Sequence, residues 1–379
     1  MFQTKGHIDW LILLPVAALM FFSLAFVYSA SATIAAIRFG SSDTLFWNHV
    51  QKVLLGFVLI LVFSKIDYHF WKKFSKPILI TAIVLLVIVL FTSPINDVRR
   101  WISLGPLTFQ PSEIAKFAMV LHFAVLLERK QEVIKDFKEG FAPFLLWTGV
   151  ICYLIIMQPN FSTAAVIYMI ALAMLFIGNT NLLHVAATSL ASLGATAMYL
   201  TATSSYRLNR ILAYFGDPGT PDKAENLNYQ LNQALIALGN GGMFGVGPGQ
   251  SRQSHLFLPE SYGDFILSII GEEYGFIGIL IIISLFILIF WRGMIIAKNA
   301  PDNFGYFLAT GIIITFAFYV FVNAGVNSGL LPTTGLPMPF ISYGGTAVLI
   351  YSAAIGVLLN ISSQAGIYPR YADEEEDKE

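Results

Sequence analysis

Residues 258–290 read LPESYGDFILSIIGEEYGFIGILIIISLFILIF, and this stretch decides the kind of fold. Polar, glycine-rich sequence occupies 204–264 and stops at Asp264, and an apolar run then extends from Phe265 to Phe290. Such a run exceeds the roughly 20 apolar residues with which an α-helix spans a bilayer. The sequence therefore predicts a membrane helix with a carboxylate at its lip, where the side chain reaches both water and lipid headgroups.

The composition of the whole chain agrees with that reading. Of 379 residues, 56% are hydrophobic and 12% are charged, and the mean hydropathy is +0.70. Soluble domains carry roughly 25% charged residues, so the chain is predicted to be an integral membrane protein. The net charge of −1 argues against nucleic acid as a partner. Cys152, the one cysteine, excludes an internal disulfide.

Ten apolar runs qualify as membrane helices, which predicts an all-α integral membrane protein. A single polytopic domain is expected over 1–364, followed by an acidic, solvated tail over 365–379. Several runs are shorter than a bilayer requires, so we expect the helices to extend into the loops. The runs are 10–29, 49–64, 78–92, 112–127, 142–157, 161–178, 183–203, 265–291, 304–325 and 344–364.

The first run has two interpretations. Lys5, the apolar run and Ala30-Ser31-Ala32 match a signal peptide with its cleavage site. However, Leu11 to Tyr28 is longer than the roughly 7–15 apolar residues of such a peptide. We favour a retained first helix.

Lysine and arginine fix the orientation of these helices. With the N-terminus inside, the cytoplasmic segments hold most of the basic residues between the runs, and the short outer loops hold only Arg38, Arg99 and Arg100. This is the positive-inside pattern. It places both termini in the cytoplasm and the large 204–264 loop, between the seventh and eighth helices, outside. The proline-broken segment 331–340 also lies at membrane level, so we expect it to line a protein cavity rather than face lipid.

Glu113 and Lys116 stand three residues apart near the start of the fourth run, on one helix face. One interpretation is a pair at the water interface; the other is a buried ion pair that shapes a polar cavity and touches substrate. Arg99 and Arg100 precede this run. They fit a clamp for a diphosphate, and they fit interfacial anchors equally well.

Three acids accompany the eighth run. Asp264 is either the cap of this helix or a general base, and a site shielded from water would raise its pKa towards the working pH. Glu272 and Glu273 lie about 12–14 Å deeper along the helix. Helical spacing turns Glu272 towards the same side as Asp264 and Glu273 away from it, which makes Glu272 the expected partner in the cleft.

Two further patterns carry little chemistry. Gly239 to Gly249 is glycine-rich but lacks the Gly-Lys-Ser/Thr ending of a nucleotide loop, so we predict an outer loop that is either flexible or tightly turned. The six histidines show no metal-ligand spacing, and His122 is predicted to be a packed residue.

Four separated motifs resemble the SEDS family of shape, elongation, division and sporulation proteins, and the resemblance spans nearly the whole chain. One departure is Gly263, because family members commonly have a hydroxyl residue before the aspartate. The motifs are Arg99-Arg100-Trp101-Ile102 with Phe109 to Lys116, Tyr229-Gln230 leading to Ala237 to Gly242, Leu258-Pro259-Glu260 to Ile266, and Gly335-Leu336-Pro337 through Gly345.

The resemblance implies a peptidoglycan glycosyltransferase of the bacterial cytoplasmic membrane that polymerises lipid II, the undecaprenyl-diphosphate-linked disaccharide peptide. It implies a class B penicillin-binding protein and other divisome proteins as partners. Phe244 to Ser251 and Tyr206 to Arg210 resemble division-type members more than elongation-type ones. Asp264 is implied as the catalytic base, with no certain cofactor and a divalent cation left open. The residues assigned to substrate binding are Arg100, Glu113, Lys116, Arg210, Gln233, Glu260, Glu272 and Ser342.

Alternative functions remain open at this point. Many helices, buried charges and a broken helix also fit a transporter that flips lipid II across the membrane. An elongation-type polymerase and a non-catalytic scaffold of a division complex are further alternatives.

Overall fold

The computed structural model describes residues 6–94, 98–104, 107–203, 221–255 and 257–366. Arg210 and most of the predicted acidic tail lie outside these residues. The described elements are α1 Trp10–Phe39, α2 Thr44–Lys65, α3 Tyr68–Ile88, the 3₁₀ turn Val89–Phe91, β1 Ile102–Leu104, β2 Leu107–Phe109, α4 Pro111–Arg129, the π turn Phe137–Phe141, α5 Ala142–Met157, α6 Phe161–Ile177, α7 Leu182–Thr203, α9 Pro221–Gly241, α10 Ile266–Lys298, α11 Asn303–Asn327 and α12 Gly345–Gln364.

Each of the ten apolar runs coincides with a helix, and most of these helices extend beyond the run, as expected. In the part of the chain that the structure describes, seven helices are long and apolar enough to cross a membrane. α1 continues through Ala30-Ser31-Ala32 to Phe39 and ends at Gly40, whose φ of 74° is the left-handed conformation typical of a helix terminus. The protein is therefore a multi-pass helical membrane protein.

Two elements were not predicted. β1 and β2 form an antiparallel hairpin before α4, so the prediction of an all-α fold is wrong in this detail. α9 lies within the segment 204–264, for which the sequence predicts a loop, so that prediction is wrong over 221–241. Its helix is too polar for a membrane span, and its buried side includes Ala234 and Ala237, three residues apart. A search for long apolar runs misses such an amphipathic helix.

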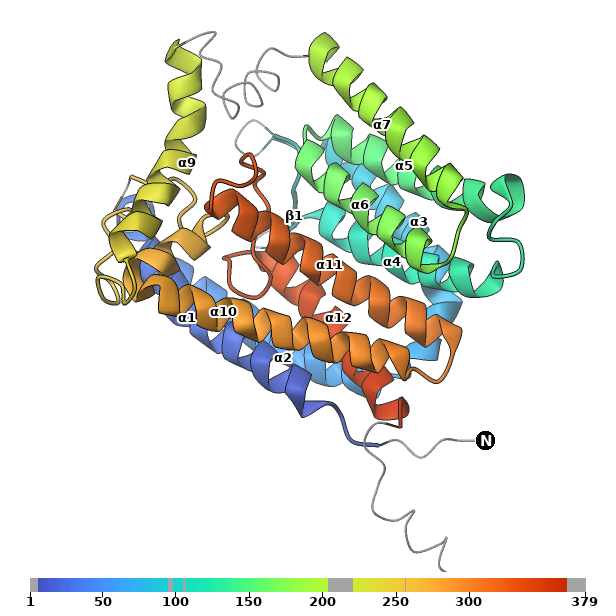
Figure 1. The fold of residues 1–379 in the computed structure, drawn as a ribbon. Helices are drawn as coiled ribbons and strands as arrows, with labels where there is room; N and C mark the ends of the chain where they lie inside the picture. The colour runs from blue at the N-terminus through green and yellow to red at the C-terminus, as the bar shows by residue number, and fades with distance from the viewer. Residues whose placement is uncertain (1–5, 95–97, 105–106, 204–220, 256, 367–379) are drawn as a thin grey trace, which may run out of the picture.

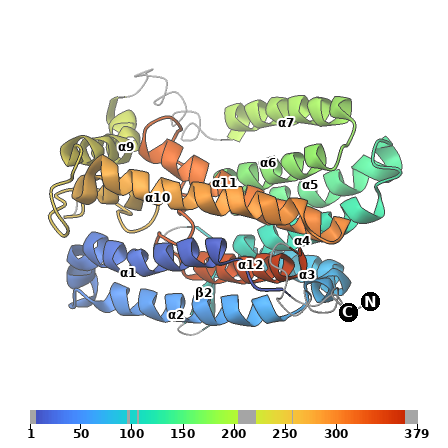
Figure 2. The same ribbon diagram turned by 60° about the horizontal axis from the view of Figure 1, so that its bottom comes forward.

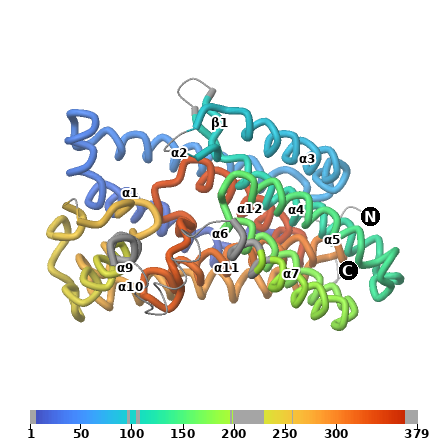
Figure 3. Tube along the Cα trace, turned by 90° about the horizontal axis from the view of Figure 1, so that it is seen from above, coloured from blue at the N-terminus to red at the C-terminus, as the bar shows by residue number. Residues whose placement is uncertain are grey.

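The helices form a bundle around α11 and α12, the two most buried spans (Figure 1). α2 packs along α12, α10 lies between α1 and α11, and α4 lies between α3 and α11. α7 packs on α6 at the outside of the bundle (Figures 1 and 2). Viewed from above, α9 lies over the start of α10, at the opposite end of the bundle from the N-terminus (Figure 3).

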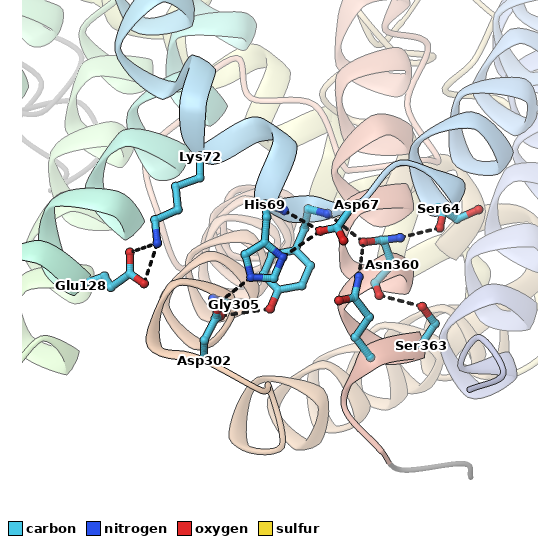
Figure 4. A network of polar contacts seen from close by, with 11 residues as sticks. Ser64, Asp67, His69, Lys72, Glu128, Asp302, Gly305, Asn360 and Ser363 are labelled. Atoms are coloured by element: carbon cyan, nitrogen blue, oxygen red, sulfur yellow. Dashed lines mark hydrogen bonds and ion pairs between the residues drawn. The ribbon is translucent and has the colours of Figure 1, made fainter. Parts of the chain in front are cut away.

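Ion pairs close the end of the bundle that carries the N-terminus. Asp9, before α1, binds Arg292 of α10 at 2.5 Å. His69 of α3 bridges Asp67 and Asp302, at 2.8 and 2.7 Å, and thereby joins α3 to the start of α11 (Figure 4). The ends of α2, α10 and α12 meet here as well. The starts of α10 and α12 and the end of α11 consequently meet at the opposite end, where Asp264 lies.

Candidate active site

Asp264 lies just before α10 and does not cap it. α10 begins at Ile266, and the residue at the cap position is Phe265, which makes no side-chain capping bond. The interpretation of Asp264 as the helix cap is therefore wrong. Asn327 of α11 takes the capping role instead. Its Oδ1 accepts hydrogen bonds from the backbone amide of Ser268 (3.0 Å) and from the Ser268 hydroxyl group (2.7 Å). The carboxylate of Asp264 is left available for other interactions.

The backbone at Asp264 is held from two sides. Nδ2 of Asn323 and Nδ2 of Asn327, both on α11, donate to the carbonyl oxygen of Asp264 at 2.8 and 3.0 Å. Oγ of Ser342 donates to the preceding carbonyl oxygen, that of Gly263, at 2.7 Å. Consecutive carbonyl groups are thus fixed by α11 and by the segment before α12, which sets the direction of the Asp264 side chain.

That side chain faces the proline-broken segment 331–340. Gly335 has a φ of +73°, and a Cβ added to it would lie 3.3 Å from Oδ2 of Asp264. Nδ2 of Asn323 also donates to the carbonyl oxygen of Leu336 at 2.8 Å. One side-chain amide thus binds both the backbone at Asp264 and the backbone next to Gly335. Leu336 and Met338 are buried, at 3% and 1% exposure. The second half of the segment, 336–340, is thus mostly buried within the protein, while its lining of a cavity stays a prediction.

The surroundings of Asp264 favour its neutral form. Burial, and after it the nearby charge of Glu260, raise the pKa of this carboxyl against the opposing effect of Arg100, and together they bring it to about 7. Glu260 adopts a left-handed φ of 57°, which is uncommon outside glycine and aspartate or asparagine. A carboxyl group with a pKa near 7 can accept a proton from a hydroxyl group and release it again at neutral pH.

Arg99 and Arg100 bind backbone carbonyl groups in this structure. The guanidinium of Arg100 donates to the carbonyl oxygen of Gln158 at 3.2 Å and to that of Pro159, in the turn between α5 and α6. Arg99 donates to the carbonyl oxygen of Leu90 at 3.0 Å. Arg100 also acts electrostatically on Asp264, whereas Arg99 is exposed. Of the two, Arg100 is the one that the fold associates with the candidate site.

Glu113 and Lys116 form an ion pair within the bundle. Nζ of Lys116 lies 2.8 Å from Oε2 of Glu113 and donates to Oη of Tyr351 at 2.9 Å. It also lies 3.8 Å from the ring centroid of Tyr319. Lys116 is fully buried and Glu113 is 3% exposed, so the interpretation as a pair at the water interface is wrong.

The pair is connected to Asp264 through α11. Tyr319, which covers Lys116, stands four residues before Asn323, which holds the carbonyl group of Asp264. Residues four apart lie on one face of a helix. Phe340, at the end of the broken segment, packs near Tyr351, with ring centroids 6.0 Å apart. The pair therefore supports the same part of the bundle that positions Asp264.

α10 is broken at Gly275, and the glycine-rich segment fills the break. Gly275 has a φ of 67° and a ψ of −166°, so the prediction of one uninterrupted helix over 265–291 is wrong at this point. The amides of Val246 and Gly247 donate to the carbonyl groups of Glu272 and Glu273, at 2.9 and 3.0 Å. The predicted loop is wrong for 239–241, which end α9, and a tight turn is confirmed for 242–249; the amides of Val246 and Gly247 are used within the protein.

Glu272 was predicted to lie beside Asp264, but it binds the segment that follows α9. Its Oε2 accepts hydrogen bonds from Oγ of Ser251 (2.5 Å) and from the amide of Gln253 (3.2 Å), so it holds the segment after α9. Glu273 accepts a hydrogen bond from Ser29 of α1. Helical spacing alone could not place Glu272, because the segment that surrounds it comes from elsewhere in the chain.

The other predicted residues have mixed outcomes. Gln233 is half-buried on α9, and His122 is packed against Trp147 with ring centroids 5.6 Å apart, as expected. Asn323 and Asn327 were missed. Their signal was present, since amides inside an apolar helix mark interhelical hydrogen bonds. Among the described residues, no group of three or more His, Cys, Asp or Glu side chains is arranged to hold a metal.

The comparisons with known proteins agree with this geometry. The family model described as "Cell cycle protein", which covers FtsW, RodA and SpoVE, matches residues 9–366. "Probable peptidoglycan glycosyltransferase FtsW" of Geobacter sp. (strain M18) is 38% identical over 96% of this chain and 98% of its own. "Stage V sporulation protein E" of Bacillus subtilis (strain 168) is 39% identical over 97% and 99%, respectively.

Two solved structures share the fold. One chain of a peptidoglycan synthase complex, reported for its coordination of polymerization and crosslinking, aligns with a TM-score of 0.78 at 26% identity, over 94% of this chain and 98% of its own. The rod shape determining protein RodA of Thermus thermophilus aligns with a TM-score of 0.69 at 24% identity, over 94% and 96%.

The fold and the site together define a multi-pass helical membrane protein with a shielded carboxylate at one end of its bundle. The family match covers almost the whole length of that bundle. The chain belongs to the family of FtsW, RodA and SpoVE, and the resemblance to SEDS proteins is confirmed.

Proposed function

We propose that this protein is a peptidoglycan glycosyltransferase that polymerises lipid II in the bacterial cytoplasmic membrane. Relatives that match nearly the whole chain carry the name peptidoglycan glycosyltransferase. The observation that carries the proposal is the state of Asp264: its backbone is fixed by Asn323, Asn327 and Ser342, while its carboxylate does not cap the helix.

Asp264 acts as the general base. It takes the proton from the 4-hydroxyl group of the acceptor sugar, whose oxygen attacks the anomeric carbon of the donor. The bond from that carbon to the polyprenyl diphosphate breaks, and the diphosphate leaves with the electron pair. Glycosidases use a second carboxyl group to protonate a poor leaving group. A diphosphate leaves without a proton, so a single base is sufficient. A pKa of about 7 suits this role.

Cations balance the charge of the leaving diphosphate. Arg100 is a candidate because it already acts electrostatically on Asp264. Arg210 is a second candidate from the resemblance. Lys116 is enclosed by Glu113, Tyr319 and Tyr351, so its role is to support the site and to contribute its field from a distance.

The cellular role is division, in complex with a class B penicillin-binding protein and other divisome proteins. The support comes from the relatives named FtsW and from the match to a chain of a peptidoglycan synthase complex. Depletion of the protein tests this role: cells that form filaments support division, and cells that become round indicate elongation.

A lipid II flippase is the second candidate, since the broken α10 and the buried charges also fit a transporter. Purified protein with its partner and lipid II in detergent distinguishes the two. Detergent micelles have no two sides, so glycan polymer formed there cannot result from flipping. Absence of polymer under conditions in which a known polymerase is active would contradict the proposal.

A further inference from the structure

Lys52 is a basic residue that the proposed mechanism does not use. It lies on α2, about two turns from the helix start, at the same end of the bundle as Asp264. Its side chain is partly exposed, and Nζ lies 4.2 Å from the centroid of the Tyr343 ring. The ammonium group is thus held in a defined place while it remains open on one side.

Tyr343 connects Lys52 to the stretch that carries Asp264. The amide of Tyr343 donates to the carbonyl oxygen of Tyr262 at 2.9 Å, and the two rings meet edge to face with centroids 5.6 Å apart. Tyr262 stands two residues before Asp264. Hydrogen bonds from Ser342 and Tyr343 therefore attach the segment that carries Tyr343 to the backbone just before Asp264.

The chain that leads into α12 contacts both residues. Gly335, near its start, lies against the carboxylate of Asp264, with 3.3 Å between Oδ2 and an added Cβ. Gly345, the first residue of α12, lies against Lys52, with 3.4 Å between Nζ and an added Cβ. The ammonium group and the carboxylate thus contact the same stretch of chain, 335–345.

Lys52 differs from three other cations of the described bundle in lacking an acceptor. Lys116 pairs with Glu113, Arg292 with Asp9, and Arg100 binds carbonyl groups. Within the described ranges, Lys52 makes neither a hydrogen bond nor an ion pair, and its neighbour His49 is buried against Ser23. A partly desolvated ammonium group without an acceptor is costly, and an anionic ligand would remove that cost.

We propose that Lys52 binds an anionic group of the lipid-linked substrate, through a phosphate or carboxylate oxygen. This inference rests on the proposed function and extends it, since it assigns a substrate contact on α2. The oxygen belongs either to the diphosphate or to a carboxylate of the stem peptide. In both cases the ammonium group and the Tyr343 ring hold one anionic group of the substrate while Asp264 acts on the sugar.

The test compares Lys52→Met and Lys52→Arg with the unaltered protein, using Lys73→Met as a matched control. Lys73 is exposed on α3, at the opposite end of the bundle. A charged hydrogen bond contributes about 1.5–3 kcal/mol, so the KM for lipid II should rise by about tenfold or more in Lys52→Met. We expect kcat to change by less than about threefold, and Lys52→Arg and the control to stay near the unaltered protein. A KM within about twofold of the unaltered protein in Lys52→Met would overturn the inference.

A second measurement needs no variant. Acetylation of Lys52 in the intact protein, followed by mass spectrometry, should slow by about fivefold when lipid II is present at saturation. Equal rates with and without lipid II would contradict the inference even if Lys52→Met failed to fold.

Substrate variants distinguish the two sources of the anion. With lipid II whose stem-peptide carboxylates are amidated, the KM difference between Lys52→Met and the unaltered protein disappears if the peptide is bound. The difference persists if the diphosphate is bound. Failure of the proposed function has another signature, because the unaltered protein would then form no polymer at all.

Discussion

Replacement of Glu113 by glutamine tests whether the buried ion pair supports the site. The substitution leaves the Lys116 ammonium group, which is fully buried, without its anion at 2.8 Å. Breaking a buried pair from one side costs about 3–5 kcal/mol. Tyr351 and the ring of Tyr319, at 2.9 and 3.8 Å, retain part of the stabilisation, which favours the lower value of about 3 kcal/mol. At about 2 °C per kcal/mol for a chain of this size, the unfolding midpoint should fall by about 6 °C.

The double variant Glu113→Gln/Lys116→Met should recover most of that loss. It contains no isolated charge, and apolar replacements of buried pairs are often neutral. Thermal unfolding of the purified protein in detergent, followed by circular dichroism, measures both effects. Glu128→Gln is the control, since Lys72 and Glu128 are 29% and 20% exposed and such pairs contribute about 0–1 kcal/mol. The reasoning would be refuted by a Glu113→Gln midpoint equal to that of the unaltered protein, or by a double variant less stable than either single one.

Three further predictions concern the surroundings of Asp264. A base with a pKa of about 7 is active when ionised, so the polymerisation rate should rise as the pH increases through 7. In pH–rate profiles, Glu260→Gln should move that rise to lower pH, because Glu260 raises the pKa of Asp264, and Arg100→Gln should move it to higher pH, because Arg100 lowers that pKa. Asn327→Ala should lower kcat by about tenfold at unchanged KM, because Asp264 loses a bond to its carbonyl group and α10 loses its cap; equal kcat values would contradict this. Gly335→Ala should lower the stability by about 1–2 kcal/mol, because alanine is strained at a φ of +73°, and should also lower the polymerisation rate. A variant with an unaltered unfolding midpoint and an unaltered polymerisation rate would show that the contact between Gly335 and Asp264 is unimportant.

The sequence was sufficient to predict the membrane helices and the place of Asp264. Long apolar runs carry a strong signal, because each span must bury its backbone polar groups within its own helix. The buried Glu113–Lys116 pair was one of the two interpretations that the sequence allowed, since charges within a bilayer need a partner. These features depend on local sequence alone.

Features that depend on distant segments were not predicted. The break of α10 at Gly275 requires the segment around Val246 to supply hydrogen-bond partners, and no helical periodicity reports that contact. Glu272 was misplaced for the same reason. Asn323 and Asn327 were visible as polar residues in an apolar helix, but their target, the carbonyl group of Asp264, belongs to the turn before α10, a distant part of the chain.

The most direct test of the account is the polymerisation of lipid II by Asp264→Asn protein, purified with its partner in detergent. Loss of a general base lowers the rate by about 10²–10⁴-fold, so no glycan polymer should be detected, while the unfolding midpoint stays near that of the unaltered protein. Asp43→Asn, which changes a partly exposed acid between α1 and α2, is the control and should remain active. Polymer formed at the unaltered rate by Asp264→Asn would remove Asp264 from the reaction and contradict the central claim.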